Sequence, residues 1–388
     1  MRVYTPDEEE RIHLQKQVRG WARSGLLRKE QGGAGGTLDA ALRTDLKRTN
    51  DFLRFVLQLF TVIISASAIG LAFLTLKPKS NGGSAVLLLF AALGCAALVE
   101  WIIGSLRVYR YGVEEALTVV AVVTLAIAAG LTVGGDRAAL TAGLLVGALA
   151  SFAAYGRYGF VYALLAAIAC AAALPFPQDL PQQVRRVLSV GILLISFAAA
   201  RALRRQHEGT YLGDEYELAE AAAWTGAYLL LNLVVTDPGF FFGRAPTHDW
   251  FYRATYLATW LMPIAGLTLA IRNKERTFLT TNLALAIVTI ATNKTYLGLT
   301  HHSWDPMLLG VLMMGTAIGV RRWLSSGLNG ERSGFTPQRI LVTDRELLQT
   351  VANVSAAFRT HPAPAPAPGQ PPEFGGGRSG GGGATGGF

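Results

Sequence analysis

Long apolar segments follow one another through most of this chain, and they constrain its fold more than any other feature. Residues 55–76 and 85–106 are two of them, both rich in Leu, Ala, Ile and Val. A bilayer core about 30 Å thick accommodates roughly 20 residues of helix, and only helices or closed barrels satisfy their backbone groups there. The segments lack the alternating polar residues of a barrel strand. The sequence therefore predicts an all-α fold, a polytopic transmembrane helical bundle.

The number of apolar segments predicts about ten spans. Composition agrees, because 51% of the residues are hydrophobic and 16% are charged, and this apolar excess must face lipid. Several segments are shorter than a full span, so one pair could form a re-entrant hairpin or two oblique helices. The expected spans are 55–76, 85–106, 115–133, 138–154, 160–174, 187–203, 218–235, 252–271, 277–292 and 307–320.

The spans divide the chain into four regions. Residues 1–51 form a polar N-terminal region, 52–323 the transmembrane domain, 324–360 a second polar region, and 361–388 a tail rich in Pro and Gly. No apolar signal-peptide core precedes the first span. The tail offers too little apolar surface to offset the entropy of ordering, so we expect it to be disordered.

Each polar region is predicted to contain a short amphipathic helix. Leu14, Val18, Trp21 and Ala22 recur on one helical face. Residues 343–346, Thr-Asp-Arg-Glu, match the capping box that begins a helix. Either helix could rest on the membrane, contact a protein partner, or pack on the loops between spans.

The basic residues near the span ends predict the orientation of the chain. More of them fall on the side that holds the N-terminus, as Arg48, Arg205 and Arg322 do, than on the side of Arg244 and Lys294. The positive-inside rule then places both termini in the cytoplasm. The excess of Arg over Lys, with abundant Ala and Gly, is typical of GC-rich bacterial genomes, so we expect a bacterial inner membrane.

The net charge of +9 does not indicate a nucleic-acid partner, because the basic residues are scattered between apolar segments. The expected partners are membrane lipids and a protein contacted through the terminal helices, and the oligomeric state is left open. Cys95 and Cys170 both lie in apolar segments, where a thiol behaves as a small hydrophobic group. We expect no disulfide between them.

Ionisable residues within a span often mark a transport path, because a charge at the bilayer centre is costly. The residues concerned are Arg54, Glu100, Arg201 and Glu220. All four fall near span ends, where long side chains reach water and the two carboxylates can pair with arginines of the loops. This position disfavours a proton- or sodium-coupled transporter that depends on deep carboxylates.

Glycine pairs at four-residue spacing occur within several spans and let helix backbones approach closely. The pattern favours tight packing within one chain over a dimer. The pairs are Gly130/Gly134, Gly143/Gly147 and Gly315/Gly319.

Histidine and aspartate gather in two loops between the later spans. If the two intervening segments both cross the membrane, these loops share the periplasmic face. Imidazole and carboxylate can bind zinc or act in acid–base catalysis. The spacing matches no metal motif such as His-Glu-x-x-His, so ordinary interfacial loops are the alternative, and no catalytic residue or cofactor is assigned. The candidate metal ligands are His248, Asp249, His301, His302 and Asp305.

Residues 18–31 read Val-Arg-Gly-Trp-Ala-Arg-Ser-Gly-Leu-Leu-Arg-Lys-Glu-Gln. This segment resembles the Trp-x-x-x-Gly-Leu-Leu/Ile-x-x-x-Gln opening of a family of predicted bacterial multi-pass membrane proteins of unknown function. In that family the motif precedes a run of apolar spans, as it does here. The resemblance implies a membrane protein and brings no activity with it.

Together these features favour a non-enzymatic membrane scaffold or a passive conduit. Two alternatives stay open: a membrane-embedded, metal-dependent enzyme that uses the loop histidines and aspartates, and a transporter without deep carboxylates. The chain contains no Gly-rich phosphate-binding motif followed by Lys-Ser/Thr and no nucleophile elbow. We therefore do not expect nucleotide-driven coupling.

Overall fold

The structure is a computed structural model that describes residues 3–23, 27, 30, 36–207, 210–236, 249–297 and 304–327. Within these ranges the regular elements are all helices, as the apolar segments predict. The helices are α1 (Pro6–Arg23), α3 (Thr37–Ala41), α4 (Asp51–Leu76), α5 (Asn81–Leu106), α6 (Val113–Thr132), α7 (Asp136–Tyr158), α8 (Val161–Ala173), α9 (Gln182–Gln206), α10 (Tyr211–Leu231), α11 (Leu233–Thr236), α13 (Trp250–Asn273), α14 (Arg276–Tyr296) and α15 (Asp305–Ser325). The expected C-terminal helix and Pro/Gly-rich tail lie outside the described residues.

Six of the described helices are long and apolar enough to cross a membrane, namely α4, α5, α6, α7, α9 and α13. Their outer surfaces are apolar too: Phe52, Leu74 and Phe90 are each at least 70% exposed. A soluble bundle would bury such side chains, whereas lipid covers them at no cost. By the same criteria α8, α10, α14 and α15 fall short in length or apolar character.

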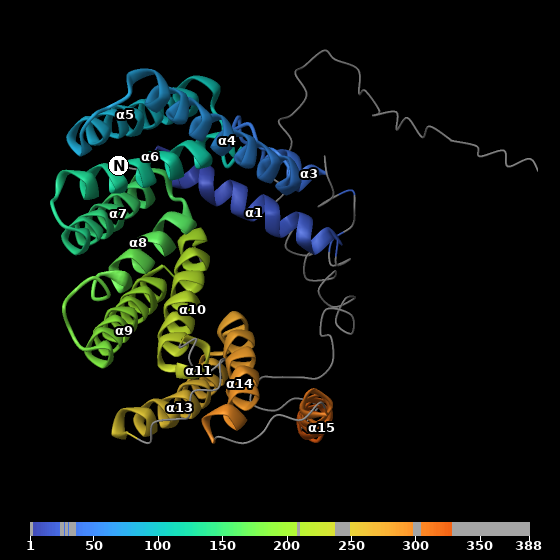
Figure 1. Cartoon of the computed structure of the whole chain (residues 1–388). Helices are drawn as coiled ribbons and strands as arrows, with labels where there is room; N and C mark the ends of the chain where they lie inside the picture. Colours follow the sequence, from blue (N-terminus) through green and yellow to red (C-terminus); the bar gives the residue numbers. More distant parts are fainter. Residues whose placement is uncertain are drawn as a thin grey trace, which may run out of the picture.

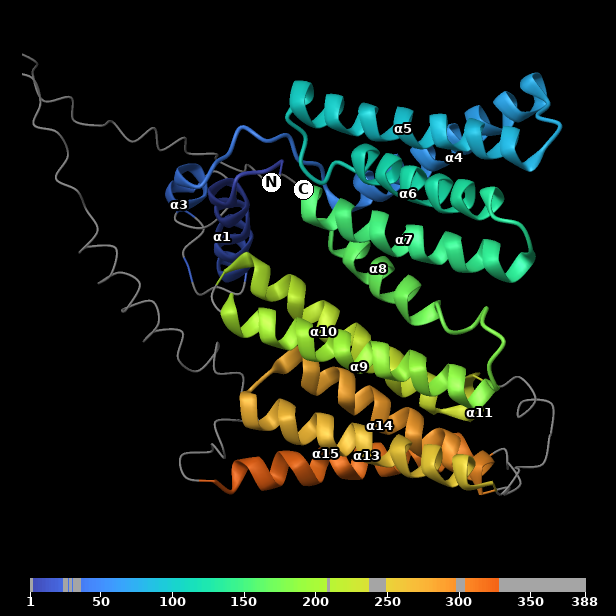
Figure 2. The same cartoon turned by 90° about the vertical axis from the view of Figure 1, so that its left-hand side faces the viewer.

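The long helices lie side by side and form two groups (Figures 1 and 2). In the first group α4, α5 and α7 pack on α6 and α8 packs on α7, and the second packs α9, α13 and α14 on α10. The groups join where α8 packs on α9 and α10. Helix α15 stands apart from its neighbours in Figure 1. Helix α1 crosses one end of the bundle, which we call the α1 end (Figure 2).

Local sequence explains the tight connection between α4 and α5. Lys77 ends α4 in the left-handed conformation at φ 42°, and its N–H donates to the carbonyl of Phe73. Ser80 then begins α5, because its hydroxyl accepts a hydrogen bond from Gly83 N–H at 3.2 Å. Two consecutive helices can therefore reverse direction within the four residues between Leu76 and Asn81.

The glycine pairs give a mixed result. A Cβ on Gly130 would lie 2.9 Å from the carbonyl oxygen of Ala139, and one on Gly143 would lie 3.1 Å from that of Ala126. These two glycines let α6 and α7 approach backbone to backbone, which confirms the prediction of close intrachain packing. The prediction is wrong for Gly134 and for Gly315/Gly319, where a Cβ would meet no atom within 4 Å. The latter pair lies on α15, which has few neighbours.

Candidate functional site

The structure describes two of the five candidate metal ligands. Asp249 is the exposed residue before α13, and its side chain does not cap that helix. Asp305 begins α15 and forms an ion pair with Lys294 of α14 at 2.5 Å. Among the described residues, no three His, Cys, Asp or Glu side chains gather in a way that could hold a metal. His248, His301 and His302 lie outside the described residues, so the metal site stays a prediction.

Charged side chains concentrate instead at the α1 end, beginning with α1 itself. Thr5 and Glu8 form a reciprocal capping box: Glu8 N–H donates to Thr5 Oγ1 at 3.3 Å, and Thr5 N–H donates to Glu8 Oε2 at 3.2 Å. Pro6 follows Thr5 at the first helical position, which suits its fixed φ. The acidic first turn also complements the helix dipole.

Polar contacts hold α1 on the bundle. Tyr4 Oη donates to the carbonyl of Val108 at 3.0 Å, and burial raises the pKa of this phenol. Glu8 pairs with Arg107 at 3.0 Å, Glu10 accepts from Tyr211 N–H at 3.2 Å, and His13 Nε2 lies 3.6 Å from Asp214 Oδ2. These contacts fix α1 against the connection between α5 and α6 and against the start of α10.

The side of α1 that faces the bundle carries both polar and apolar residues. Glu9 and Gln15 are almost fully buried and Ile12 is buried beside them, whereas Leu14 is 37% exposed and Trp21 is 46% exposed. Only Val18 of the predicted face is buried. Leu14 and Trp21 therefore face away from the bundle, because hydrogen-bond and charge partners at the helix ends of the bundle determine how α1 rotates.

A second set of contacts joins α1 to α3 and to the segment before α4. Arg19 donates two hydrogen bonds to the Asp39 carboxylate, at 2.6 and 3.1 Å, and hydrogen bonding to Asp39 raises the pKa of Arg19. Gln15 donates to the carbonyl of Asp39 and accepts from Arg48. Burial lowers the pKa of Arg48, and the charge of Arg19 acts in the same direction. The N-terminal region is thus part of the fold.

Beneath α1, arginine–carboxylate pairs join the ends of neighbouring helices. Arg54 of α4 donates to Glu115 of α6 at 2.6 Å, and Arg110 donates to Glu215 of α10 at 3.0 Å. Glu115 and Glu215 are nearly fully buried. Gly112 lets the start of α6 lie against α4, since a Cβ there would overlap the carbonyl of Arg54.

The pairs continue across the second group of helices. Arg201 of α9 pairs with Glu220 of α10 and lies 3.4 Å from Glu275, which precedes α14. Arg204 contacts the same two carboxylates at 3.2 and 3.5 Å. Together with the Arg54–Glu115, Arg110–Glu215 and Arg157–Glu100 pairs, these contacts form what we call the ion-pair layer.

The ion-pair layer confirms that Glu100 and Glu220 pair with arginines at helix ends. Sequence reasoning missed Glu115 and Glu215 as members. Their own helices carry other acidic residues nearby, and no local pattern identifies which carboxylate meets an arginine more than 60 residues away. Such pairing depends on which helices become neighbours.

A charged cavity of about 310 Å³ lies between α1 and the ion-pair layer. Charged side chains of both signs line it. Lys16, on the exposed rim, has no ion-pair partner among the described residues. The charged or titratable lining residues are Glu9, His13, Lys16, Arg48, Arg54, Tyr109, Arg110, Tyr211, Asp214 and Glu215.

A polar seam runs between α10, α13 and α14. Trp224 Nε1–H donates to Asn282 Oδ1 at 2.8 Å, and Tyr228 Oη and Thr289 Oγ1 share a hydrogen bond of 2.8 Å. Asn232 Nδ2 donates to Tyr228 Oη at 3.2 Å. All five side chains are buried, and Thr289 Oγ1 also lies 3.0 Å from the carbonyl oxygen of Thr259, so the seam joins α10, α14 and α13.

Comparison with family models, curated proteins and solved structures finds no match to this chain.

Proposed function

We propose that this protein is a multi-pass membrane scaffold that performs no catalysis and presents its N-terminal helix to a protein partner at the membrane surface. The observation that carries the proposal is the mode of α1 docking. Its polar side contacts the α5–α6 connection and the start of α10 through Glu8, Glu10 and His13, while Leu14 and Trp21 face outward. A docked helix with outward apolar side chains suits recognition by another protein.

The ion-pair layer supports a structural role for the charged residues. Glu115, Glu215 and Glu220 are buried and engaged with arginines of other elements. A carboxylate that carries ions or protons through a transporter must exchange partners, whereas a buried pair that loses one member leaves an uncompensated charge. The pairs therefore favour a rigid platform over a carrier.

The proposed topology uses ten spans, α4 to α10 and α13 to α15, with α11 as a short extension of α10. Consecutive spans reverse direction, so an even number returns the chain to the α1 end. The basic residues at that end include Arg107, Arg157 and Arg204, and the positive-inside rule then puts both termini in the cytoplasm of a bacterial inner membrane.

The test places a photo-crosslinking amino acid at Leu14 or Trp21 of the full chain in its native membrane. Trp250, an even more exposed tryptophan at the opposite end of the bundle, is the control. We expect one protein adduct of the same mass from positions 14 and 21 and none of that mass from position 250. Adducts that contain only lipid, or the same adduct from all three positions, would contradict the proposal that α1 contacts a protein partner.

A further inference from the structure

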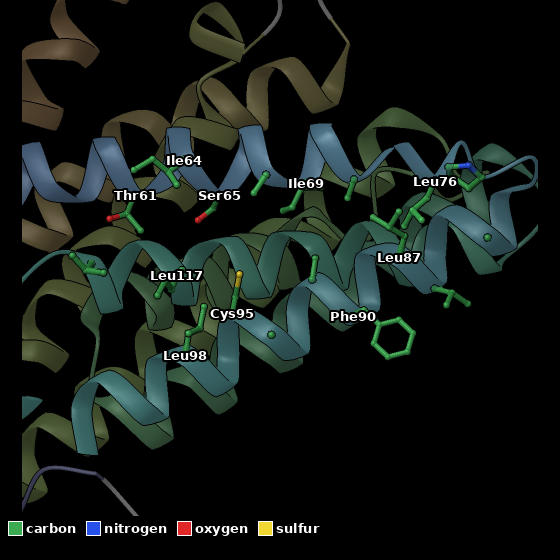
Figure 3. Close-up of a pocket in the computed structure, with 18 residues that line it drawn as sticks. Thr61, Ile64, Ser65, Ile69, Leu76, Leu87, Phe90, Cys95, Leu98 and Leu117 are labelled. Carbon is green, nitrogen blue, oxygen red and sulfur yellow. The ribbon is translucent and has the colours of Figure 1, made fainter. Parts of the chain in front are cut away.

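An apolar groove lies between α4 and α5, and the ligand that it suits does not depend on the proposed scaffold function. The two helices are close near their connecting turn, where Ile69 and Phe73 of α4 pack on Ala85 and Leu88 of α5. Figure 3 shows them diverging from Leu76 and Leu87 toward Thr61 and Leu98, with Leu117 of α6 behind the gap. The groove encloses about 900 Å³.

Its lining is apolar over the whole length of the groove. The only hydroxyls come from Thr61 and Ser65, and Thr61 donates its hydrogen to the carbonyl of its own helix at Leu57, 2.8 Å away. The lining lies on two helices that are long and apolar enough to cross a membrane, so the groove opens at the level of the hydrocarbon. Water fills such a space poorly, and an acyl chain fills it well.

Basic side chains flank the narrow end of the groove. Leu76 and Pro78 line it, Lys77 lies between them in sequence, and Lys79 follows. Both lysines are exposed and have no ion-pair partner within the part of the chain that the structure describes. At a membrane surface each lysine attracts an anionic headgroup. From this end the groove widens, as two acyl chains of one lipid require.

We propose that the α4–α5 groove binds an anionic glycerophospholipid, with its acyl chains between α4 and α5 and its phosphate at Lys77 and Lys79. A bound lipid would supply the contacts that α4 lacks along its inner face. In the absence of a bound lipid, α4 is supported mainly by α6.

The first test fills the groove with a side chain. Gly94 lines the groove, and a Cβ there meets no atom within 4 Å, so Gly94→Phe adds a ring to the groove without a clash at its Cβ. Gly70→Phe is the matched control, because Gly70 is also open but lies on the opposite side of α4 from the lining residues. The full chain is purified, delipidated and titrated with phosphatidylglycerol, and native mass spectrometry measures the bound lipid.

We expect Gly94→Phe to weaken phosphatidylglycerol binding more than about tenfold, because the ring displaces at least two methylenes, while Gly70→Phe binds as the parent does. Equal binding by the parent and Gly94→Phe, or no saturable binding by the parent, overturns the proposal. A parent dimer that Gly94→Phe converts to monomer overturns it in favour of a second copy in the groove.

The second test separates the headgroup from the acyl chains. The Lys77→Gln/Lys79→Gln variant is expected to lose its preference for phosphatidylglycerol over phosphatidylcholine, by about fivefold for each lysine. Lys274→Gln is the control, because Lys274 is another exposed lysine in the left-handed conformation after a helix, at φ 58°. Equal affinity of the parent for the two lipids overturns the assignment of an anionic lipid.

Discussion

At the scale of single residues, Gly266 shows how one missing side chain permits a buried hydrogen bond. A Cβ on Gly266 of α13 would overlap the amide group of Asn282. Because that space is empty, the Asn282 amide lies against α13, accepts from Trp224 and donates to the carbonyl of Phe278 at 2.8 Å. The polar seam between α10, α13 and α14 therefore requires a glycine at position 266.

We expect Gly266→Ala to lower the free energy of unfolding by about 1–3 kcal/mol, since it displaces Asn282 and leaves the buried Trp224 N–H without its acceptor. Thermal unfolding of the purified protein in detergent measures this loss. Gly191→Ala is the matched control, because a Cβ at Gly191 meets nothing within 4 Å and should leave stability unchanged or slightly raised. Equal melting temperatures for both variants would contradict the role of Gly266.

The carboxylates of the ion-pair layer should differ in their contribution to stability. Glu220 is fully buried and pairs with both Arg201 and Arg204, so Glu220→Gln leaves Glu275 as the carboxylate that both arginines share and should cost about 3 kcal/mol. Glu100 and its partner Arg157 are each more than 40% exposed, and Glu100→Gln should cost less than about 1 kcal/mol. Unfolding in increasing denaturant measures both, and a reversed order would show that the burial of these pairs is misassigned.

At the scale of helices, α13 and α14 are joined through the Thr259 carbonyl of α13, which has no backbone donor within its own helix. Pro263 lies inside α13 and has no N–H, so the carbonyl of Thr259 lacks its usual helical donor. Thr289 Oγ1 of α14 lies 3.0 Å from that carbonyl and can donate to it. The hydroxyl thereby links Tyr228 of α10 to the interrupted turn of α13.

A double-mutant cycle tests this link. Thr289→Val should cost about 1–3 kcal/mol, because it leaves the Thr259 carbonyl without its donor and the Tyr228 O–H without its acceptor. In a Pro263→Ala background the restored N–H can satisfy the Thr259 carbonyl, so the same Thr289→Val change should cost less. An identical cost in both backgrounds would mean that Thr289 does not serve the carbonyl freed by the proline.

Sequence patterns predicted elements much better than contacts between elements. The segments 55–76 and 85–106 correspond to α4 and α5 because apolar length is a local property of the chain. The rotation of α1 on the bundle could not be predicted, because Leu14 and Trp21 satisfy a local periodicity while the docking partners Val108 and Tyr211 come from distant segments. The cavity under α1 could not be predicted for the same reason.

At the scale of the whole molecule, an even number of crossings places several connections on one side. Val3 N–H donates to the carbonyl of Arg157, and Tyr4 Oη to that of Val108, so the connections after α5 and α7 lie at the same end as α1. The N-terminal region can make these contacts only if both connections share its side of the membrane.

Reporter fusions can test this arrangement. Fusions after Arg48 and Arg205 should report the cytoplasm, and fusions near Arg137 and Lys294 should report the periplasm, since these positions alternate along reversing helices. The Arg137 fusion is informative because it depends only on α4 to α6. Opposite signals from the Arg48 and Arg205 fusions would rule out an even number of membrane crossings between these two positions.

The unequal distribution of ion pairs predicts that the two ends of the bundle undergo local opening with different frequencies. Buried arginine–carboxylate pairs join helices at the α1 end, whereas at the other end the described pairs are the exposed Arg137–Asp179 contact and the partly exposed Lys294–Asp305 contact. Local opening costs least where few buried contacts resist it, so the far turns of α6 and α7 should open more often than their turns beneath α1. Within one helix, backbone amides near Thr132 should exchange with deuterium sooner than those near Ala116.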